Sequence, residues 1–323
     1  MNLIETMSLA EMKDYRGRMD VPEDFAQFWQ EQVDALEFPN NFQLDKMNFD
    51  LAFIDCYELR FKSEPAAEVY AKCIVPRHAE NVPVIFYFHG YQGQGPDWSE
   101  MFKFSAAGFA VVCMDVRGQS GYSTDGSSFK GNTVKGHIIR GAIQGREHLF
   151  YREIYLDLCR LVNLVSTFTW ADEERLYTYG ASQGAALALV TAALNPQIQK
   201  TVAIYPFLSD FKRVLELGDT SEAYNELFRY FKFHDPFHET EAELLHTLSY
   251  IDVKNFAHLI QAEVKMITGL QDDVCPPSTQ FAIYNRLEGD KELKIMPEYN
   301  HEAMNVKVND LVFNWLVGSK INI

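Results

Sequence analysis

Short apolar runs alternate with segments of helical periodicity along most of the chain. The continuous apolar run at 82–88, and another within 109–118, predict strands that are buried on both faces, as in a parallel sheet. Residues 150–168 place apolar side chains at helical spacing and predict a long amphipathic helix. Further strands are predicted at 175–180, 200–206, 264–269 and 292–297, and further helices at 99–108, 185–189 and 307–318. Strands that alternate with helices in this way predict an α/β fold with a doubly wound, mostly parallel sheet.

Two parts of the chain depart from this alternation. Residues from 1 to about 45 predict an N-terminal helical extension, with a helix at 21–36. Residues 54–61 and 68–75 follow, and because only a short polar segment separates them, they predict antiparallel strands at the edge of the sheet. Residues from about 207 to 257 predict aromatic-rich helices between two strands, which we interpret as a helical cap insertion over the carboxyl edge of the sheet.

Composition restricts the class of protein and its partners. The 323 residues are 47% hydrophobic and contain no linker or repeat, so we expect a single domain over 1–323. The formal net charge of −16 argues against a nucleic-acid partner or an anionic membrane, because both select basic surfaces. The sequence has no apolar run that is long enough to span a bilayer, and the first residues lack the pattern of a signal peptide.

The cysteines point to a reducing compartment. They are odd in number, scattered and without a CxxC pair, so the sequence predicts free thiols in a cytoplasmic protein. They are Cys56, Cys73, Cys113, Cys159 and Cys275.

A serine between two glycines lies where a predicted strand gives way to an alanine-rich helix. The stretch 176–187, LYTYGASQGAAL, contains Gly180, Ser182 and Gly184 in the pattern G-x-S-x-G. This pattern occurs by chance in many long chains, but its position at a strand-to-helix junction predicts a nucleophile elbow, a tight turn that exposes the serine oxygen.

Candidate partners for this serine follow later in the chain. A serine hydroxyl is a weak nucleophile that needs a base within hydrogen-bond reach and a third group to orient that base. In the α/β-hydrolase arrangement these groups follow in the order serine, acid, histidine, each on a loop after a strand. Asp272 or Asp273 follows the strand at 264–269, and His301 follows the strand at 292–297. We therefore predict a triad of Ser182, one of the two aspartates, and His301.

Two backbone N–H groups are predicted to form an oxyanion hole. One belongs to Gln183, which follows the nucleophile, and the other to Tyr91 in the glycine-rich loop after the strand at 82–88. Tyr91, with Tyr205 and Phe207, is also a candidate for contact with the substrate. The last two follow the strand at 200–206 and are candidates for the walls of a small acyl pocket, with simple core packing as the alternative.

Several other polar residues are predicted to be structural. His89 precedes the glycine-rich loop and is expected to hold it, rather than to act as the base. Arg117 and Gln119 follow a strand at the same sheet edge and are expected to pin neighbouring loops. Cys275 lies beside the proposed acid without an elbow of its own and is predicted to take no part.

Two histidines have the spacing of metal ligands on a helix. His234 and His238 are four residues apart, but Pro236 between them argues against a regular helix and no third ligand is evident. We therefore predict no metal site at these histidines.

The motifs together resemble the acetyl xylan esterase / cephalosporin-C deacetylase family. The similarity runs from about Val21 to the closing helix. It rests on HGYQG at 89–93, RGQ at 117–119, GASQG at 180–184, DDVCPPST at 272–279 and HE at 301–302, with support from PEDFAQFW at 22–29, YREIYLDLCR at 151–160 and TLSYIDVKNFA at 247–257.

The resemblance assigns roles position by position. It implies Ser182 as nucleophile, His301 as general base and Asp272, rather than Asp273, as the orienting acid. It also implies that the N–H groups of Tyr91 and Gln183 form the oxyanion hole. The chain departs from the family pattern at three positions. The family usually has glycine at the positions of Ala181 and Ala185, and a basic or neutral residue at the position of Asp273.

The resemblance also implies an activity. Members of the family remove acetyl groups from small acetylated sugars such as xylo-oligosaccharides, and from cephalosporin C, without metal or cofactor. Members of the family form cytoplasmic hexamers, so the resemblance implies a cytoplasmic homo-oligomer here as well. One alternative is a serine peptidase of the same fold. Such peptidases usually carry a further domain, and this chain has no room for an added propeller. The other alternative is a non-catalytic binding protein on the same scaffold, but such proteins commonly lose a triad residue, and here all three are present.

Overall fold

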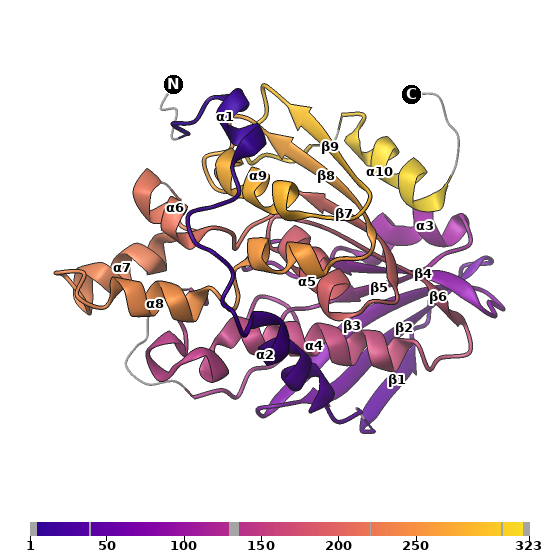
Figure 1. Ribbon diagram of the computed structural model, residues 1–323. Helices are drawn as coiled ribbons and strands as arrows, with labels where there is room; N and C mark the ends of the chain where they lie inside the picture. Colours follow the sequence, from indigo (N-terminus) through magenta and orange to yellow (C-terminus); the bar gives the residue numbers. More distant parts are fainter. Residues whose placement is uncertain (1–4, 39, 129–135, 220, 305, 319–323) are drawn as a thin grey trace.

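A nine-stranded sheet organises the chain (Figure 1). The computed structural model describes residues 5–38, 40–128, 136–219, 221–304 and 306–318. The strands are β1 Phe42–Lys46, β2 Ile54–Ser63, β3 Ala67–Pro76, β4 Val82–Phe88, β5 Ala110–Met114, β6 Ala171–Ala181, β7 Ile198–Ile204, β8 Glu263–Gly269 and β9 Lys291–Met296. The α-helices are α1 Leu9–Asp14, α2 Phe25–Asp34, α3 Phe102–Ala106, α4 Phe150–Val165, α5 Gln183–Leu194, α6 Phe211–Leu217, α7 Asn225–Phe233, α8 Glu241–Leu248, α9 Pro277–Arg286 and α10 Val308–Val317.

The strand order shows a mixed sheet with a parallel main part. The order is β1-β2-β3-β5-β4-β6-β7-β8-β9. Strands β1, β2, β3 and β5 pair with one another in antiparallel fashion, and all pairs from β5 to β9 are parallel. In this order β5 lies between β3 and β4, so neighbouring strands are not always consecutive in the chain. The parallel strands are joined by connections that cross the sheet and contain helices. The predicted α/β-hydrolase architecture is confirmed.

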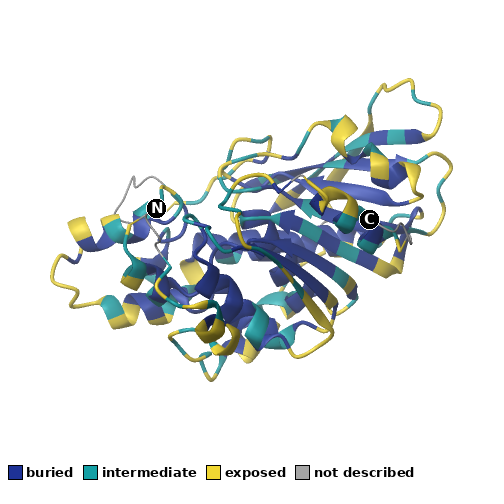
Figure 2. Cartoon of the chain, turned by 90° about the horizontal axis from the view of Figure 1, so that it is seen from above, coloured by how far each residue is buried: buried dark blue, intermediate teal, exposed yellow. Residues whose placement is uncertain are grey.

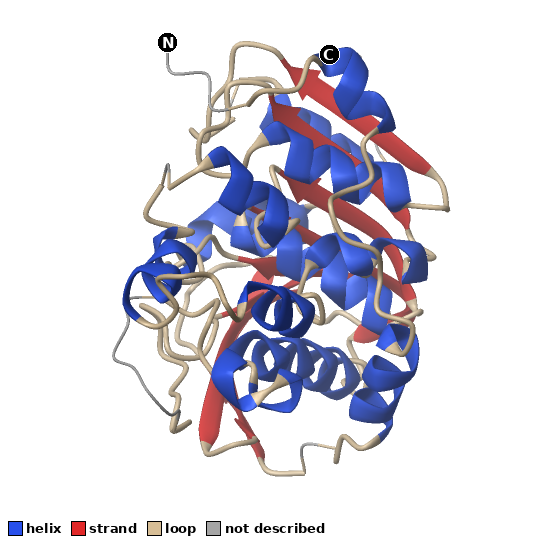
Figure 3. Cartoon of the chain, turned by 60° about the vertical axis from the view of Figure 1, so that its left-hand side comes forward, coloured by secondary structure: helices blue, strands red, loops and turns tan. Residues whose placement is uncertain are grey.

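Helices cover both faces of the sheet (Figure 3). Alternate side chains of β4 enter two separate cores, because successive residues of a strand point to opposite faces. Val84 and Phe86 join α2, α4 and α5 on one face, whereas Ile85 joins α3 and α10 on the other. In Figure 2 the strands at the centre are largely buried, and the exposed residues gather on outer helices and loops. The continuous apolar run at 82–88 is therefore a consequence of burial on both sides.

The structure corrects two details of the predicted sheet edge. Strand β1 lies inside the stretch predicted to be a helical extension, and it is the outermost strand in place of β2 and β3. Its residues FQLDK are exposed at four of five positions. The strand is held by backbone pairing, from Phe42 opposite Phe61 to Lys46 opposite Tyr57. The only sequence signal is a short alternation of Phe42 and Leu44 with polar residues, which is too brief to predict a strand.

The segment between β7 and β8 is helical, as predicted, and carries α6, α7 and α8. These three helices lie together outside the sheet, at the left of Figure 1. The N-terminal extension packs against the end of this segment, where the Trp29 indole N–H donates to the carbonyl oxygen of Tyr250 at 3.0 Å. Glu5 bridges the insertion and the body of the protein, because its carboxylate accepts from Arg213 of α6 at 2.7 Å and from the Ser278 N–H of α9 at 2.9 Å.

Within the ranges given above, no helix combines the length and the apolar character that crossing a bilayer requires.

Candidate active site

Ser182 lies in the sharp turn between β6 and α5. Its backbone has φ 57° and ψ −120°, a left-handed conformation that a residue with a side chain rarely adopts. The two flanking glycines allow this turn by close packing. A Cβ atom on Gly180 would overlap the backbone of Gly184, and one on Gly184 would overlap the carbonyl oxygen of Phe88. The predicted elbow therefore needs glycine at both positions for steric reasons.

Ser182, His301 and Asp272 form a continuous hydrogen-bonded chain. His301 Nε2 lies 3.0 Å from Ser182 Oγ, and His301 Nδ1 lies 2.9 Å from Asp272 Oδ2. Because the ionised carboxylate only accepts, Nδ1 carries the proton and Nε2 is free to accept the proton of the serine. Both distances are within the range that proton transfer from a serine requires.

The carboxylate of Asp272 is buried and fixed by its own loop. Its Oδ1 accepts from the N–H groups of Val274 at 3.0 Å and Cys275 at 2.7 Å, and Gln280 donates to Oδ2 at 3.2 Å. These bonds aim the second oxygen at His301. Asp272, the first of the two candidate aspartates, is thus the residue that accepts the hydrogen bond of the imidazole.

The loops that carry the acid and the histidine are joined through Asn300. Its Oδ1 accepts from the N–H of Asp273 at 2.9 Å and from the N–H of His301 at 2.7 Å. A second link runs from the Gln271 N–H to the Tyr299 carbonyl oxygen at 3.0 Å. The spacing between acid and base is therefore set by the backbones of two loops as well as by the side chains.

The two segments whose residues are predicted to donate to the oxyanion are linked to each other through the side chain of Gln119. Gln183 is the first residue of α5, and the first N–H groups of a helix have no acceptor within that helix. Its side chain is buried and forms a reciprocal amide pair with Gln119, with distances of 2.7 and 3.1 Å. Gln119 also accepts from the Gln92 N–H at 2.8 Å. The glycine-rich loop that contains Tyr91 is thereby pinned to the elbow.

His89 and Arg117 hold the surrounding framework. The Val116 N–H donates to His89 Nε2 at 2.9 Å, so Nδ1 carries the proton that goes to the Gly90 carbonyl oxygen at 2.8 Å. Burial lowers the pKa of His89, which keeps this neutral form. Arg117 is fully buried against Asp157, with contacts of 2.7 Å. Both residues have the structural surroundings that the sequence predicts for them.

Tyr205 and Phe207 lie beside the triad. The Tyr205 ring packs against the His301 imidazole with centroids 4.4 Å apart. The Phe207 N–H donates to the Ser182 carbonyl oxygen at 3.2 Å, and its ring is 5.3 Å from that of Tyr91. The Phe207 side chain is completely buried, so it contributes to the core as well as to the neighbourhood of the nucleophile.

Cys275 is closer to the nucleophile than the sequence indicates. Its thiol is fully buried, which raises its pKa well above the usual value, and a hydrogen bond with the Ser182 hydroxyl acts in the opposite direction. The only sequence signal was its position three residues after the acid. The side-chain contact with Ser182 depends on how the acid loop folds back on the elbow.

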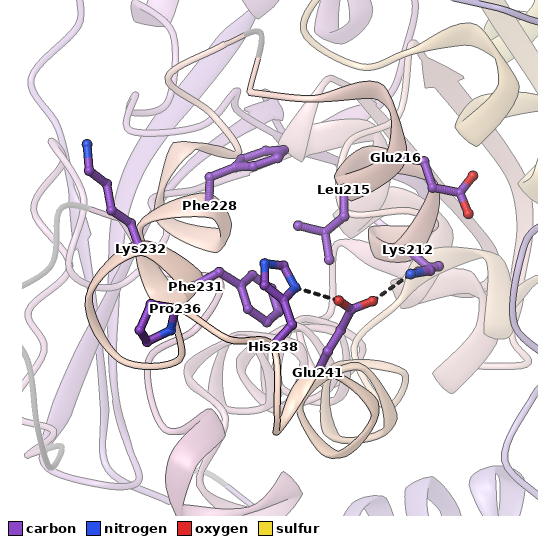
Figure 4. A pocket seen from close by; sticks show the side chains of 9 residues that line it. All are labelled: Lys212, Leu215, Glu216, Phe228, Phe231, Lys232, Pro236, His238 and Glu241. Carbon is purple, nitrogen blue, oxygen red and sulfur yellow. Dashed lines mark hydrogen bonds and ion pairs between the residues drawn. The ribbon is translucent and has the colours of Figure 1, made fainter.

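A separate pocket of about 540 Å³ lies between α6, α7 and α8, and only the second of the two histidines considered as metal ligands is part of its lining (Figure 4). His238 lines it, stacks on Phe231 with centroids 4.1 Å apart, and hydrogen-bonds to Glu241 at 2.6 Å. His234 stacks instead on Tyr230. The triad residues do not line this pocket. In the part of the chain that the structure describes, no group of three or more His, Cys, Asp or Glu side chains is placed to hold a metal ion.

The sheet, the elbow and the loops after β8 and β9 define a protein of the α/β-hydrolase fold. The family model for acetyl xylan esterase (AXE1) matches residues 1–319. The chain belongs to the acetyl xylan esterase family.

Individual relatives agree with this membership. The crystal structure of acetyl xylan esterase 1 from Thermoanaerobacterium sp. JW/SL YS485 is 41% identical with a TM-score of 0.93, covering 98% of this chain and 99% of that one. An acetyl xylan esterase from Paenibacillus sp. R4 is 29% identical with a TM-score of 0.91, over 97% and 99%. The acetyl esterase Axe7A of Xylanibacter ruminicola is 28% identical over 287 residues, which are 87% of this chain, and the match spans 63% of the length of Axe7A.

Proposed function

We propose that the protein is a serine esterase that removes acetyl groups from small acetylated carbohydrates. The observation that carries this proposal is the hydrogen-bonded chain from Ser182 through His301 to Asp272, placed at a strained elbow. Membership of the acetyl xylan esterase family supports acetyl esters as the substrate class. Cephalosporin C, which also carries an acetyl ester, is the second substrate that we propose.

The proposed reaction has two halves. His301 Nε2 takes the proton of Ser182 as Oγ attacks the acetyl carbonyl carbon, and the resulting tetrahedral intermediate breaks its C–O bond to the sugar. The imidazolium gives its proton to the departing alcohol and leaves an acetyl group on Ser182. Water, deprotonated by His301, then attacks the carbonyl carbon of this acetyl-enzyme. The bond between that carbon and Ser182 Oγ breaks, His301 returns the proton to Oγ, and acetate leaves. Asp272 keeps His301 in the required tautomer and stabilises its charged form in both halves.

The oxyanion of each tetrahedral intermediate is assigned to the backbone N–H groups of Tyr91 and Gln183. The position of Gln183 at the start of α5 supports this role, because the helix dipole adds positive potential where the negative charge develops. A donor of this kind typically contributes about 10²- to 10³-fold to kcat.

A steep dependence on acyl length is expected. The Tyr205 ring packs on His301 and the Phe207 ring on Tyr91, and we propose that these rings wall the acyl site. Extending the acyl group into a packed wall typically costs about 1–3 kcal/mol. From p-nitrophenyl acetate to the butyrate, kcat/KM should therefore fall about tenfold or more, because 1.4 kcal/mol corresponds to a factor of ten. A flat profile from acetate to octanoate would exclude a small acyl pocket.

The substrate class is tested by measuring acetate release from acetylated xylose, acetylated xylo-oligosaccharides and cephalosporin C in parallel. We expect the acetylated sugars and cephalosporin C to be cleaved, and an aminoacyl p-nitroanilide to be resistant. Faster cleavage of the anilide than of any acetyl ester would favour the peptidase alternative. Loss of all these activities would favour a binding protein on a hydrolase scaffold.

We also propose that the enzyme is a cytoplasmic homo-oligomer, with a hexamer as the expected state. All five cysteines are buried free thiols, as suits a reducing compartment, and the aromatic side chains of Phe233 and Phe237 on the insertion are 60% and 82% exposed. Light scattering coupled to size exclusion should give about six times the chain mass of 37.1 kDa. A mass of one chain at micromolar concentration would contradict the oligomer.

A further inference from the structure

Glu226 is a buried carboxylate that the proposed reaction does not use. It lies in the first turn of α7, in the insertion, and only 1% of its surface is exposed. Four donors from two other loops converge on it. They are the Tyr91 hydroxyl at 3.2 Å and the N–H groups of His137 at 2.6 Å, Ile138 at 2.7 Å and Ile139 at 3.3 Å.

The site is built to receive this carboxylate. Burying a charge is costly unless hydrogen-bond donors replace the lost water, and here three consecutive backbone N–H groups do so. Gly136 approaches so closely, at φ 120°, that a Cβ there would overlap the Glu226 carboxylate. Burial raises the pKa of Glu226 to about 7, and the N–H donors act against that rise.

Tyr91 connects this carboxylate to the nucleophile. Its hydroxyl donates to Glu226 and accepts from the His137 N–H at 3.0 Å. Its ring packs between Phe207, with centroids 5.3 Å apart, and His137, with centroids 5.6 Å apart. The side chain is thus fixed at its tip and along its ring, and its own backbone N–H is the second oxyanion donor of the proposed mechanism.

We propose that Glu226 is a positioning residue for the esterase reaction: by anchoring the Tyr91 hydroxyl and the backbone of 137–139, the insertion helix α7 sets the position of the oxyanion loop. The inference rests on the proposed function, because it acts through the Tyr91 N–H. It also gives the insertion a part in catalysis that does not depend on contact with the sugar.

The expected signature is a loss in kcat with KM preserved. An oxyanion donor acts on the transition state, so a displaced Tyr91 N–H lowers kcat and leaves ground-state binding nearly unchanged. Complete loss of one donor costs about 10²- to 10³-fold in kcat, and a loosened donor should cost less. For Glu226→Gln, which keeps one acceptor oxygen but loses the charge, we expect about a tenfold lower kcat for p-nitrophenyl acetate and a KM within about twofold.

A double-mutant cycle with Tyr91→Phe separates this role from general stability. The phenylalanine keeps the ring and the backbone N–H but loses the hydroxyl that contacts Glu226. We expect Tyr91→Phe to lower kcat several-fold, and the double variant to lose clearly less than the product of the two single effects, because both changes break the same link. Effects that multiply, or a change in KM alone, would overturn the proposal.

A matched control is Glu153→Gln in α4. Glu153 is also buried and its pKa is also raised by burial, but its partner is Arg152 and not the oxyanion loop. Its kcat should stay within about twofold of the wild type. An equal loss in kcat in Glu153→Gln and Glu226→Gln would overturn the assignment. If Glu226→Gln does not fold, Tyr91→Phe alone decides, and an unchanged kcat in that variant would overturn the assignment.

Failure of this inference is distinguishable from failure of the proposed function. If the wild type cleaves acetyl esters and Glu226→Gln cleaves them equally well, Glu226 has no positioning role and the esterase assignment stands. If the wild type cleaves no acetyl ester, the proposed function itself fails.

Discussion

The Ser182→Ala variant should lose about 10⁴-fold or more in kcat for p-nitrophenyl acetate, since removing the nucleophile from a serine triad typically has effects of this size. The substitution removes one oxygen atom at a turn that already accommodates a side chain, so the fold should be unchanged. Hydrolysis is measured by release of p-nitrophenol, with each rate corrected for the uncatalysed reaction. A thermal melt of both proteins establishes that the loss does not come from unfolding.

A second readout locates the nucleophile directly. A fluorophosphonate probe should label the wild type at Ser182, identified by mass spectrometry of the modified peptide, and should not label the variant. Ser166→Ala is a suitable control because Ser166 lies at the end of α4 and its hydroxyl donates to the Val162 carbonyl oxygen within that helix. Equal rates in the wild type and Ser182→Ala would mean that another group performs the hydrolysis.

The parallel part of the fold was accessible from the sequence because burial leaves a pattern. Strands such as β4 and β5 are buried on both faces and therefore appear as continuous apolar runs. Strand β1 shows the limit of this approach. It is stabilised by backbone hydrogen bonds to β2 and keeps most of its side chains exposed, so its only signal is two apolar residues in alternation, Phe42 and Leu44.

The candidate triad was accessible for a related reason. Ser182, Asp272 and His301 each follow a strand of the parallel sheet, and parallel strands end at the same edge. Order along the chain and position after a strand were enough to predict that these side chains meet. The choice between Asp272 and Asp273 needed either the family resemblance or the observed hydrogen bond between His301 and Asp272, because the local sequence offers both acids.

The contacts of Glu226 and Cys275 were not accessible. Glu226 is an ordinary acidic residue in the first turn of a helix, a place where glutamate is favoured in any case. Its significance comes from Gly136 and Tyr91, which are 90 or more positions away in sequence and meet it only in the folded protein. Such contacts depend on how an insertion packs against the rest of the protein, and the hydrophobic pattern of the sequence does not predict this packing.

Comparing Asp272→Asn with Asp273→Asn should separate the two neighbouring acids by a large factor. Asparagine at 272 presents an amide N–H where His301 Nδ1 needs an acceptor, which favours the wrong imidazole tautomer. The same change in the triad of another serine hydrolase lowers kcat by about 10⁴-fold. We expect a loss of this order for Asp272→Asn in hydrolysis of p-nitrophenyl acetate.

Asp273→Asn changes charge and polarity by the same amount one residue away. The structure gives the backbone N–H of Asp273 a bond to Asn300, which the substitution keeps, and aims Asp272 at His301. Its kcat should therefore stay within about threefold of the wild type, as for most substitutions outside a catalytic chain. A collapse of activity in Asp273→Asn with near-normal Asp272→Asn would reverse the assignment. Because the two variants share the loop and the loss of one negative charge, a difference of several thousandfold between them is the result expected when Asp272 is the acid that orients the imidazole.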